Sequence, residues 1–290
     1  MRAPLWRNSR DMTTSSPTVL VLGGTGRTGS RIATSLTAHG ALARTGSRTG
    51  SAVMFDWDDP RTYRPALRGV SRLYLVAPTM RIRFADQVAA LLDEAVDSGV
   101  HHVTLLSAYG ADRAPAVIDL AAVEQLATEH DEFTHTILRP AWVMQNFTDD
   151  HLPLVDDALI VPSGGGAEAF VDADDIAAVA VRTLLEPTAH DGATYSLTGP
   201  AALTFEDVAA FIADVSGRPV KHVDVDQDVW IDSAVSAGVP AGYAVLLRWL
   251  TGSVIAGAGA IPTGDIEQIL GRPATDFGAF ARRNAAAWIN

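Results

Sequence analysis

Residues 19–30 read Val19-Leu20-Val21-Leu22-Gly23-Gly24-Thr25-Gly26-Arg27-Thr28-Gly29-Ser30, an apolar strand that enters a glycine-rich turn and the start of a helix. In such a turn the first glycine allows the chain to leave the strand, the second brings backbone close to a pyrophosphate, and the third lets the helix lie against the strand. Helix-start amides and the helix dipole then face the anion. Surface turns also collect glycine, but the buried-type strand before this one favours a dinucleotide loop. The predicted contacts are Gly23, Thr25, Gly26, Arg27, Thr28 and Gly29.

Beyond this loop, short apolar runs alternate with amphipathic stretches, which is typical of a parallel sheet covered by helices on both faces. We expect a doubly wound α/β (Rossmann) fold with right-handed crossovers. The predicted strands are Val19–Leu22, Ala41–Arg44, Val53–Phe55, Arg72–Val76, His102–Leu106 and Thr134–Leu138. The predicted helices are Gly26–His39, Pro60–Leu67, Phe84–Ser98 and Ile118–His130.

The regularity weakens after Arg139-Pro140, and this change predicts three parts: a disordered tail over 1–16, a dinucleotide-binding domain over 17–147, and a smaller α+β substrate lobe over 148–290. Some strands of the lobe are expected to return to the main sheet, and residues 194–197 are predicted to form a further strand. Asp172 or Asp174 caps a predicted helix through Leu185. Residues 204–207, Thr-Phe-Glu-Asp, resemble a capping box for a helix that ends at Gly217.

Composition excludes several classes of function. The formal net charge of −12 and the pI near 5.0 argue against nucleic acid as a partner, because such binding depends on clustered Lys and Arg. The chain has no cysteine, which removes disulfides and thiolate catalysis, and its eight histidines lack metal-ligand spacing. No apolar run reaches the roughly 20 residues that span a bilayer. We therefore expect a cytoplasmic protein with a small-molecule substrate and no membrane partner; homodimer formation stays open.

The segment that follows the second strand indicates which dinucleotide binds. NAD-dependent proteins place a carboxylate about 20 residues after the glycine loop, whereas an arginine there accommodates the 2′-phosphate of NADP. This chain has Arg44, Ser47 and Arg48 in that segment and no carboxylate. NADPH is the predicted cofactor. Asp56 and Trp57 are expected beside the adenine, and Ala77 and Pro78 beside the nicotinamide half.

Four further segments carry a family likeness. They are Phe55-Asp56-Trp57-Asp58-Asp59-Pro60, then Thr136 to Phe147 (Thr-Ile-Leu-Arg-Pro-Ala-Trp-Val-Met-Gln-Asn-Phe), and Phe170 to Ala177 with Leu197-Thr198-Gly199-Pro200. Together with the glycine loop, they resemble the NmrA-like family of atypical short-chain dehydrogenases/reductases, and within it the festuclavine dehydrogenase group of ergot-alkaloid biosynthesis and its bacterial relatives. The resemblance implies an NAD(P)-binding domain and a cleft against the C-terminal lobe. It places Trp142, Met144, Gln145 and Asn146 at that cleft.

The usual acid of short-chain dehydrogenases is a tyrosine activated by a lysine four residues later. Here Tyr109 is followed at that position by Arg113, and Lys221 is the chain's one lysine. This favours an acceptor that is already electrophilic, such as an imine or iminium, a quinone or a conjugated carbonyl, with catalysis resting on proximity. Ser107 and Tyr109 are the candidate proton donors. The alternative is that Ser107 only closes the strand and Tyr109 is a packed aromatic of the loop.

Two functional classes stay open at this point. One is an NADPH-dependent reductase. The other is a non-enzymatic NAD(P)-binding redox sensor, a role that some members of the resembled family have. The polar residues 149–151, Asp-Asp-His, are either a binding site for a cationic amine or a solvated surface turn.

Overall fold

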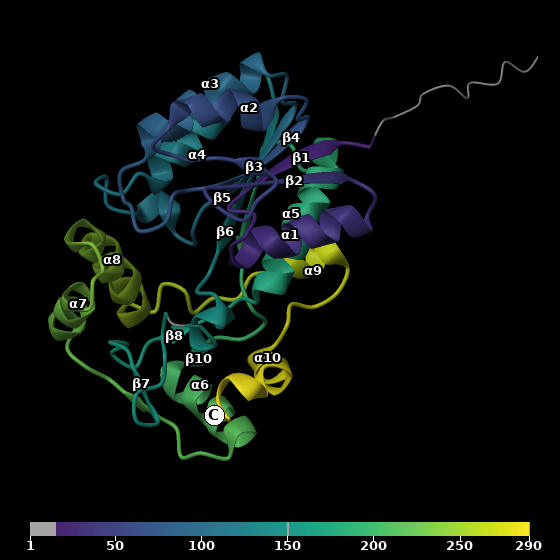
Figure 1. The fold of residues 1–290 in the computed structure, drawn as a ribbon. Coiled ribbons are helices and arrows are strands. Elements are labelled where there is room, and N and C mark those ends of the chain that lie inside the picture. The colour runs from purple at the N-terminus through teal and green to yellow at the C-terminus, as the bar shows by residue number, and fades with distance from the viewer. Residues whose placement is uncertain (1–15, 150, 290) are drawn as a thin grey trace, which may run out of the picture.

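A parallel seven-stranded sheet forms the upper half of the molecule in the computed structural model, which describes residues 16–149 and 151–289 (Figure 1). The strand order is β3-β2-β1-β4-β5-β6-β9, so the order in which successive strands are added to the sheet reverses between β1 and β4. The predicted doubly wound fold is confirmed. The tail predicted over 1–16 lies, apart from Ser16, outside the described residues. The strands are β1 (Thr18–Leu22), β2 (Leu42–Ser47), β3 (Val53–Met54), β4 (Arg72–Val76), β5 (His102–Leu106), β6 (Thr134–Pro140) and β9 (Ala193–Leu197).

Strand β1 explains why the sheet is covered on both faces. Leu20 and Leu22 belong to one apolar core and Val19 and Val21 to the other, and all four are fully buried. A strand buried on both sides reads as a continuous apolar run rather than an alternating one. The core with Leu20 and Leu22 is covered by α2 (Tyr63–Leu67), α3 (Ala85–Asp97) and α4 (Leu120–Thr128). The opposite core is covered by α1 (Arg27–Ala38), α5 (Ala173–Leu185) and α9 (Asp265–Leu270).

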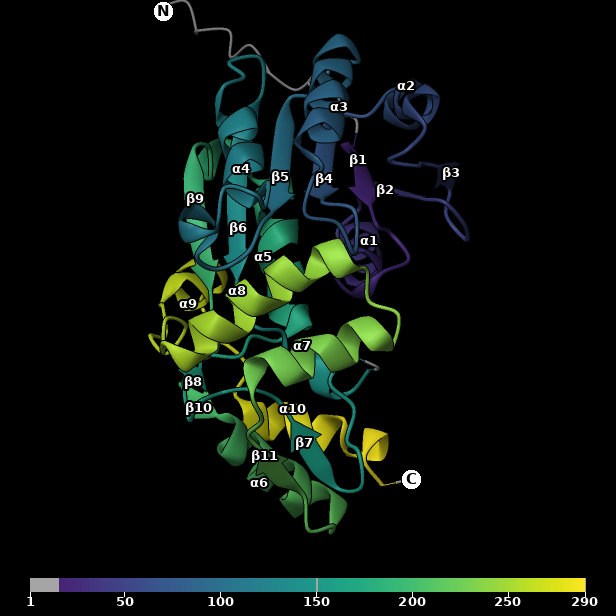
Figure 2. The same cartoon turned by 90° about the vertical axis from the view of Figure 1, so that its left-hand side faces the viewer.

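The chain crosses from the sheet into a lower lobe and back. Short turn η3 (Met144–Phe147) enters the lobe, while α5 and β9 return to the sheet, where β9 pairs in parallel with β6. Figure 2 shows α7 and α8 lying across the molecule between the sheet and the base of the lobe. The lobe contains β7 (Ala158–Ile160), β8 (Ala167–Glu168), β10 (Leu203–Thr204), α6 (Phe205–Ser216), β11 (Lys221–Val223), α7 (Gln227–Ser236), α8 (Ala244–Ile255) and α10 (Phe277–Arg283).

Helix ends follow the local sequence signals. The Thr204 side chain accepts from the Asp207 backbone N–H and the Asp207 carboxylate accepts from the Thr204 N–H, so the capping box is confirmed. Gly217 ends α6 with φ +68°. Asp172, rather than Asp174, caps α5. Strand β2 runs to Ser47, not to Arg44 as predicted, because it pairs with β1 as far as Gly46 and with β3 at Gly46 and Ser47. No helix within 16–149 and 151–289 is both long and apolar enough to cross a bilayer.

Candidate dinucleotide and substrate site

The glycine loop lies at the carboxyl end of β1, beside β4, where the strand order reverses. In open α/β sheets this crevice is where ligands bind. Gly23 has φ +61°, and the N–H of Gly26 donates to its carbonyl at 2.8 Å, which closes the turn. A Cβ on Gly29 would lie 2.2 Å from the Gly23 oxygen, so only glycine lets α1 approach this closely. Helix α1 has no side-chain cap, and its first amides are left for an anion.

Two polar residues of the loop have protein partners. The Thr28 hydroxyl accepts from buried Tyr74 at 3.0 Å, which ties the first turn of α1 to β4. The Arg27 side chain leaves the loop and reaches the lobe. Its guanidinium donates to Asn146 Oδ1 at 2.8 Å and is ion-paired with Asp149. Sequence reasoning missed this bridge because its partners lie about 120 residues further along the chain.

The structure separates the arginines expected at the 2′-phosphate. Arg44 lies in the middle of β2 and donates to the carbonyls of Ala66 and Arg68, at 3.0 and 2.7 Å. It therefore holds the end of α2. Ser47 is the last residue of β2 and Arg48 follows it at the carboxyl edge, where Arg48 is exposed. The pKa of Asp58 is lowered mainly by its hydrogen bond with Arg81 and also by the charge of Arg48, which places Arg48 near the loop after β3.

The residues expected along the adenine and nicotinamide line the ends of β3 and β4. The Asp56 carboxylate accepts from the Asp58 N–H at 3.0 Å and so shapes its own turn. The Trp57 ring packs edge-on against Phe55 and Tyr63. Ala77 and Pro78 directly follow β4 and are half-buried. All four thus lie at the carboxyl edge, and Asp56 and Trp57 also have structural partners there.

Ser107 and Tyr109 lie in the loop that continues β5. Backbone N–H groups of this loop donate to the carbonyls of Leu138 and Pro140, at 2.8 and 2.9 Å, so the loop is fixed against β6. The Ser107 hydroxyl donates to buried Glu124, whose carboxylate also accepts from Arg139. The Arg113 guanidinium lies 5.9 Å from the centre of the Tyr109 ring and faces the ring rather than activating the hydroxyl. Lys221 lies on β11 in the lobe and is exposed.

The four residues expected at the cleft divide into two pairs. Met144 and Gln145 are buried, 1% and 7% exposed, and their assignment as substrate contacts stays a prediction. The Gln145 amide donates to Asp172 and accepts from the Ala173 N–H, so it holds the start of α5. Trp142 and Asn146 are half-buried. Trp142 packs edge-on against Phe205.

Glu168 is a buried carboxyl that the sequence analysis did not single out. It lies on β8 and is 2% exposed. Burial raises its pKa to about 7, against the opposing effect of the Trp142 backbone N–H. A Cβ on Gly259 would lie 2.1 Å from both carboxylate oxygens, so the loop after α8 closes directly over this group. A lone glutamate between a glycine run and the apolar residues 169–171 was the available sequence signal.

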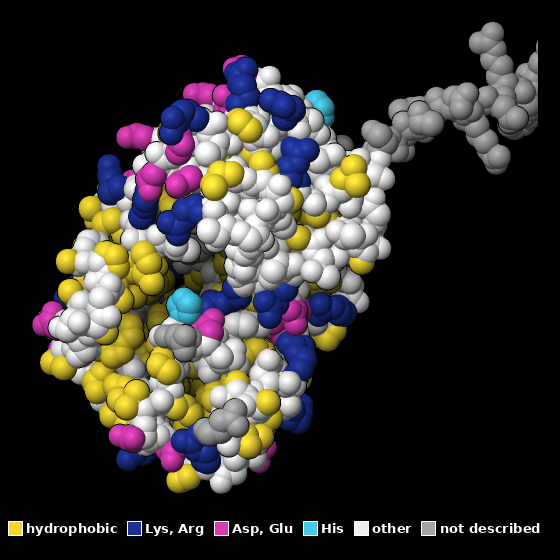
Figure 3. Space-filling model, viewed as in Figure 1, with side chains coloured by type: hydrophobic (Ala, Val, Ile, Leu, Met, Phe, Trp, Pro, Cys, Tyr) yellow, Lys and Arg dark blue, Asp and Glu magenta, His cyan; other side chains and the backbone are white. Residues whose placement is uncertain are grey.

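Helices α7 and α8 carry apolar side chains that are not fully covered. Val229, Val245 and Ile255 are exposed, and Leu246, Trp249 and Leu250 are half-buried. Figure 3 shows hydrophobic side chains gathered on this side of the molecule around a hollow between the helical pair and the rest. An apolar wall facing the carboxyl edge of the sheet is suited to an aromatic or otherwise apolar substrate.

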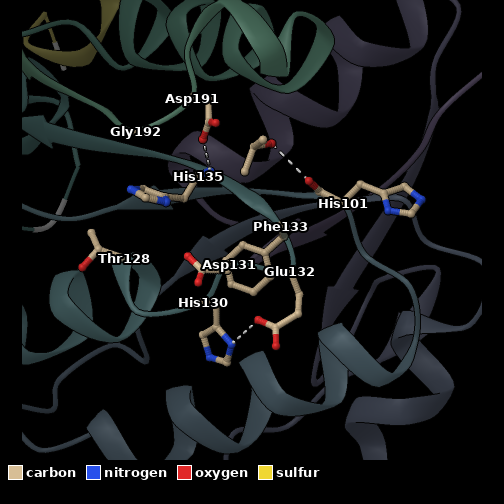
Figure 4. A pocket seen from close by; sticks show the side chains of 10 residues that line it. His101, Thr128, His130, Asp131, Glu132, Phe133, His135, Asp191 and Gly192 are labelled. Atoms are coloured by element: carbon tan, nitrogen blue, oxygen red, sulfur yellow. Dashed lines mark hydrogen bonds and ion pairs between the residues drawn. The ribbon is translucent and has the colours of Figure 1, made fainter.

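A separate cavity of about 420 Å³ lies at the opposite edge, at the amino ends of β5 and β6 (Figure 4). His101, His130 and His135 line it with Asp131, Glu132 and Asp191. His130 pairs with Glu132 at 3.5 Å and Asp191 accepts from the His135 backbone, so these groups turn to near neighbours. Among the described residues no three His, Asp or Glu side chains are arranged to hold a metal. The cavity is remote from the glycine loop and belongs to no dinucleotide site.

Fold and loop together define a dinucleotide-binding α/β protein, and comparison with known proteins gives the family. The family model described as NAD(P)H-binding matches residues 23–187. The uncharacterized oxidoreductase YesF of Bacillus subtilis is 34% identical over 281 residues, 94% of this chain and 96% of YesF. Agroclavine dehydrogenase of Claviceps fusiformis is 29% identical over 94% of this chain and 99% of its own.

Among solved structures, Citrobacter triphenylmethane reductase complexed with NADP(H) matches with a TM-score of 0.73 and 22% identity, covering 92% of this chain and 99% of that one. This likeness concerns the fold. The chain belongs to the NAD(P)H-binding, NmrA-like family, as the resemblance implied.

Proposed function

We propose that this chain is an NADPH-dependent oxidoreductase that transfers hydride to an electrophilic small molecule: an iminium, a quinone or a conjugated carbonyl. One observation carries the proposal. The glycine loop has the tight turn and the close helix approach of a pyrophosphate-binding loop, and it lies where the strand order reverses. Tyr109, in the loop that continues β5, faces Arg113 and has no lysine partner. The family relatives include a clavine dehydrogenase, which agrees with an electrophilic acceptor.

The residues divide the work by position. The amides of Arg27 to Gly29 would hold the pyrophosphate, and Arg48 with Ser47 would hold the 2′-phosphate. Ala77 and Pro78 leave room beside the nicotinamide, which supplies the hydride when bound. Trp142 and Asn146 approach the acceptor from the lobe. Ser107 is held by Glu124, and Tyr109 donates a proton where the acceptor develops an anion.

Steady-state oxidation of NADPH with a panel of iminium ions, quinones and conjugated carbonyls tests this function. We expect turnover with at least one class and none with simple ketones, which need a strong protein acid. Tight NADPH binding without turnover of any acceptor contradicts the reductase and supports a redox sensor.

The arginine assignment predicts a contrast between two variants. R48A is expected to weaken NADPH binding by roughly tenfold to a hundredfold and leave NADH binding unchanged, because it removes charge-assisted hydrogen bonds to the 2′-phosphate. R44A is expected to keep the NADPH preference and lose about 1 kcal/mol of stability, because its partners are the carbonyls of α2. Titration with both nucleotides and urea unfolding measure the two effects. The reverse pattern would return the phosphate to Arg44.

The proposed role of Tyr109 as a proton donor predicts that the activity lost on its substitution depends on the acceptor. Hydride addition to an iminium gives a neutral amine and needs no proton, whereas addition to a conjugated carbonyl creates an anion that must be protonated. Y109F is therefore expected to lower kcat about 100-fold for a conjugated carbonyl and less than about threefold for an iminium. Equal losses with both acceptors would mean that Tyr109 only packs the loop.

A further inference from the structure

Arg27 belongs to two parts of the molecule. Its backbone is the first residue of α1, at the end of the glycine loop where an anion would lie. Its side chain instead contacts three residues of the lobe: Asn146 Oδ1 at 2.8 Å, the Asp149 carboxylate, and His151 Nδ1 at 3.1 Å. All three follow β6 in the segment that carries the proposed substrate residues. We call this set of contacts the Arg27 clasp.

The segment that Arg27 contacts is held unequally along its length. Its first part, Met144 to Phe147, is fixed by the contacts of Gln145 at the start of α5 and by buried Phe147 in the lobe core. In the later part, Asp149 is half-buried and His151 is exposed. The Asp149 carboxylate contacts the His151 ring, with Nδ1 at 2.8 Å, and the Arg27 guanidinium. Arg27 is therefore the long-range tie of this turn to the dinucleotide domain.

A bound dinucleotide changes the electrostatics of the clasp. Its pyrophosphate is anionic and would be held at the start of α1, whose first residue is Arg27. A guanidinium binds carboxylate and phosphate by the same forked hydrogen bonds, so Asp149 and the pyrophosphate compete for it. Asp149 also places a negative charge beside an incoming anion, which opposes binding as long as the carboxylate stays there.

We infer that cofactor binding transfers Arg27 from Asp149 to the pyrophosphate and frees the Asp149 and His151 side chains at the substrate side. The inference rests on the dinucleotide role of the glycine loop. Cofactor occupancy and the position of this turn are then coupled, and the coupling is reciprocal: whatever holds the turn on Arg27 weakens cofactor binding by the same factor. The cofactor then binds before the residues on the substrate side take the positions in which they bind the acceptor.

The chain offers a matched control on the same helix. Arg31, one turn after Arg27, is ion-paired with Asp174 of α5, and this pair is also partly exposed. D149N and D174N each remove one negative charge near the start of α1. Both variants should therefore bind an anionic ligand somewhat more tightly, because they repel it less. D149N alone removes the ion pair of Arg27, whose contacts with Asn146 and His151 are not changed by the substitution. The difference between the two variants therefore isolates the clasp.

NADPH affinity is measured calorimetrically for the full-length wild type, D149N and D174N at low and high salt. The Arg27 and Asp149 side chains are 24% and 36% exposed, so the pair is weak and screened. We expect D149N to bind NADPH about two- to fivefold more tightly than D174N at low salt, with a smaller difference at high salt. Equal affinities of the two variants overturn the inference.

Hydrogen exchange gives the second measurement. NADPH is expected to accelerate exchange at the amides of Asp149, His151 and Leu152 in the wild type and to leave their exchange unchanged in D149N, where the Arg27 ion pair is already absent. Unchanged or slower exchange in the wild type overturns the inference. A wild type that shows no NADPH binding contradicts the cofactor assignment itself, which is a different outcome.

Discussion

Replacing Gly29 by alanine is expected to weaken NADPH binding at least about 100-fold. The new Cβ would lie 2.2 Å from the Gly23 carbonyl oxygen, a distance that no relaxed side chain tolerates. Helix α1 must then move away from the end of β1, and its first amides no longer face the pyrophosphate. Overpacking of this kind also costs about 1–3 kcal/mol of folding stability. Calorimetric titration and urea unfolding measure the two losses separately.

Two further glycine variants make the test decisive. In G26A the Cβ would lie 3.1 Å from the same oxygen, so a milder loss is expected. In G252A, within α8, the nearest atom is the Gln227 amide nitrogen at 3.5 Å, and alanine is favoured in a helix by about 0.5–1 kcal/mol. G252A should bind NADPH like the wild type. If folded G29A binds within threefold of the wild type, the loop is not the phosphate cradle.

Local chemistry made part of this structure predictable. The glycine loop, the capping box at Thr204 and Asp207, and the apolar run of β1 each act within a few residues, so the sequence displays them directly. Strand ends were harder. Pairing with β1 as far as Gly46 and with β3 through Ser47 extends β2 by three residues beyond Arg44, so Arg44 lies within the strand and Arg48 follows its end. A small error in a strand boundary therefore changed where the two arginines lie relative to the edge of the sheet.

Contacts between distant segments were not predictable. The Gln145 amide, which is predicted at the cleft, also contacts Asp172 and Ala173 at the start of a helix that begins 28 residues later. The Arg27 clasp joins positions still further apart. The strands of the lobe are only two or three residues long, and each is defined by its partner rather than by its own pattern. Such features depend on the assembled fold.

The buried Glu168 carboxyl predicts a pH dependence of stability. Its pKa is about 7 in the folded chain against an ordinary 4.5, because burial disfavours the charged form. Between these values the folded state holds more protons than the unfolded state, so the stabilising contribution is full below pH 4.5 and is lost as the pH rises through 7. At about 1.4 kcal/mol per pH unit, the loss is about 3 kcal/mol.

A second buried group has the opposite effect. Burial, aided by the charge of Arg72, lowers the pKa of His102 to about 4, and this residue contacts the hydroxyls of Thr104 and Thr134. The unfolded state then holds the extra proton, so stability falls as the pH drops from about 6.5 through 4. The wild type therefore shows a shallow profile where the two titrations overlap, and the contribution of Glu168 appears only as a difference between variants.

E168Q is expected to equal the wild type in stability below pH 4.5 and to exceed it by about 3 kcal/mol above pH 7, because the amide cannot ionise and its oxygen still accepts from Trp142. E124Q is the matched control. It removes the charge that pairs with Arg139, so it should be about 2 kcal/mol less stable than the wild type at pH 8. Urea unfolding from pH 4 to 8 measures both. A parallel profile for E168Q and the wild type would place the Glu168 carboxyl in contact with water, and the Trp142 side of the cleft would then be open rather than sealed by the loop after α8.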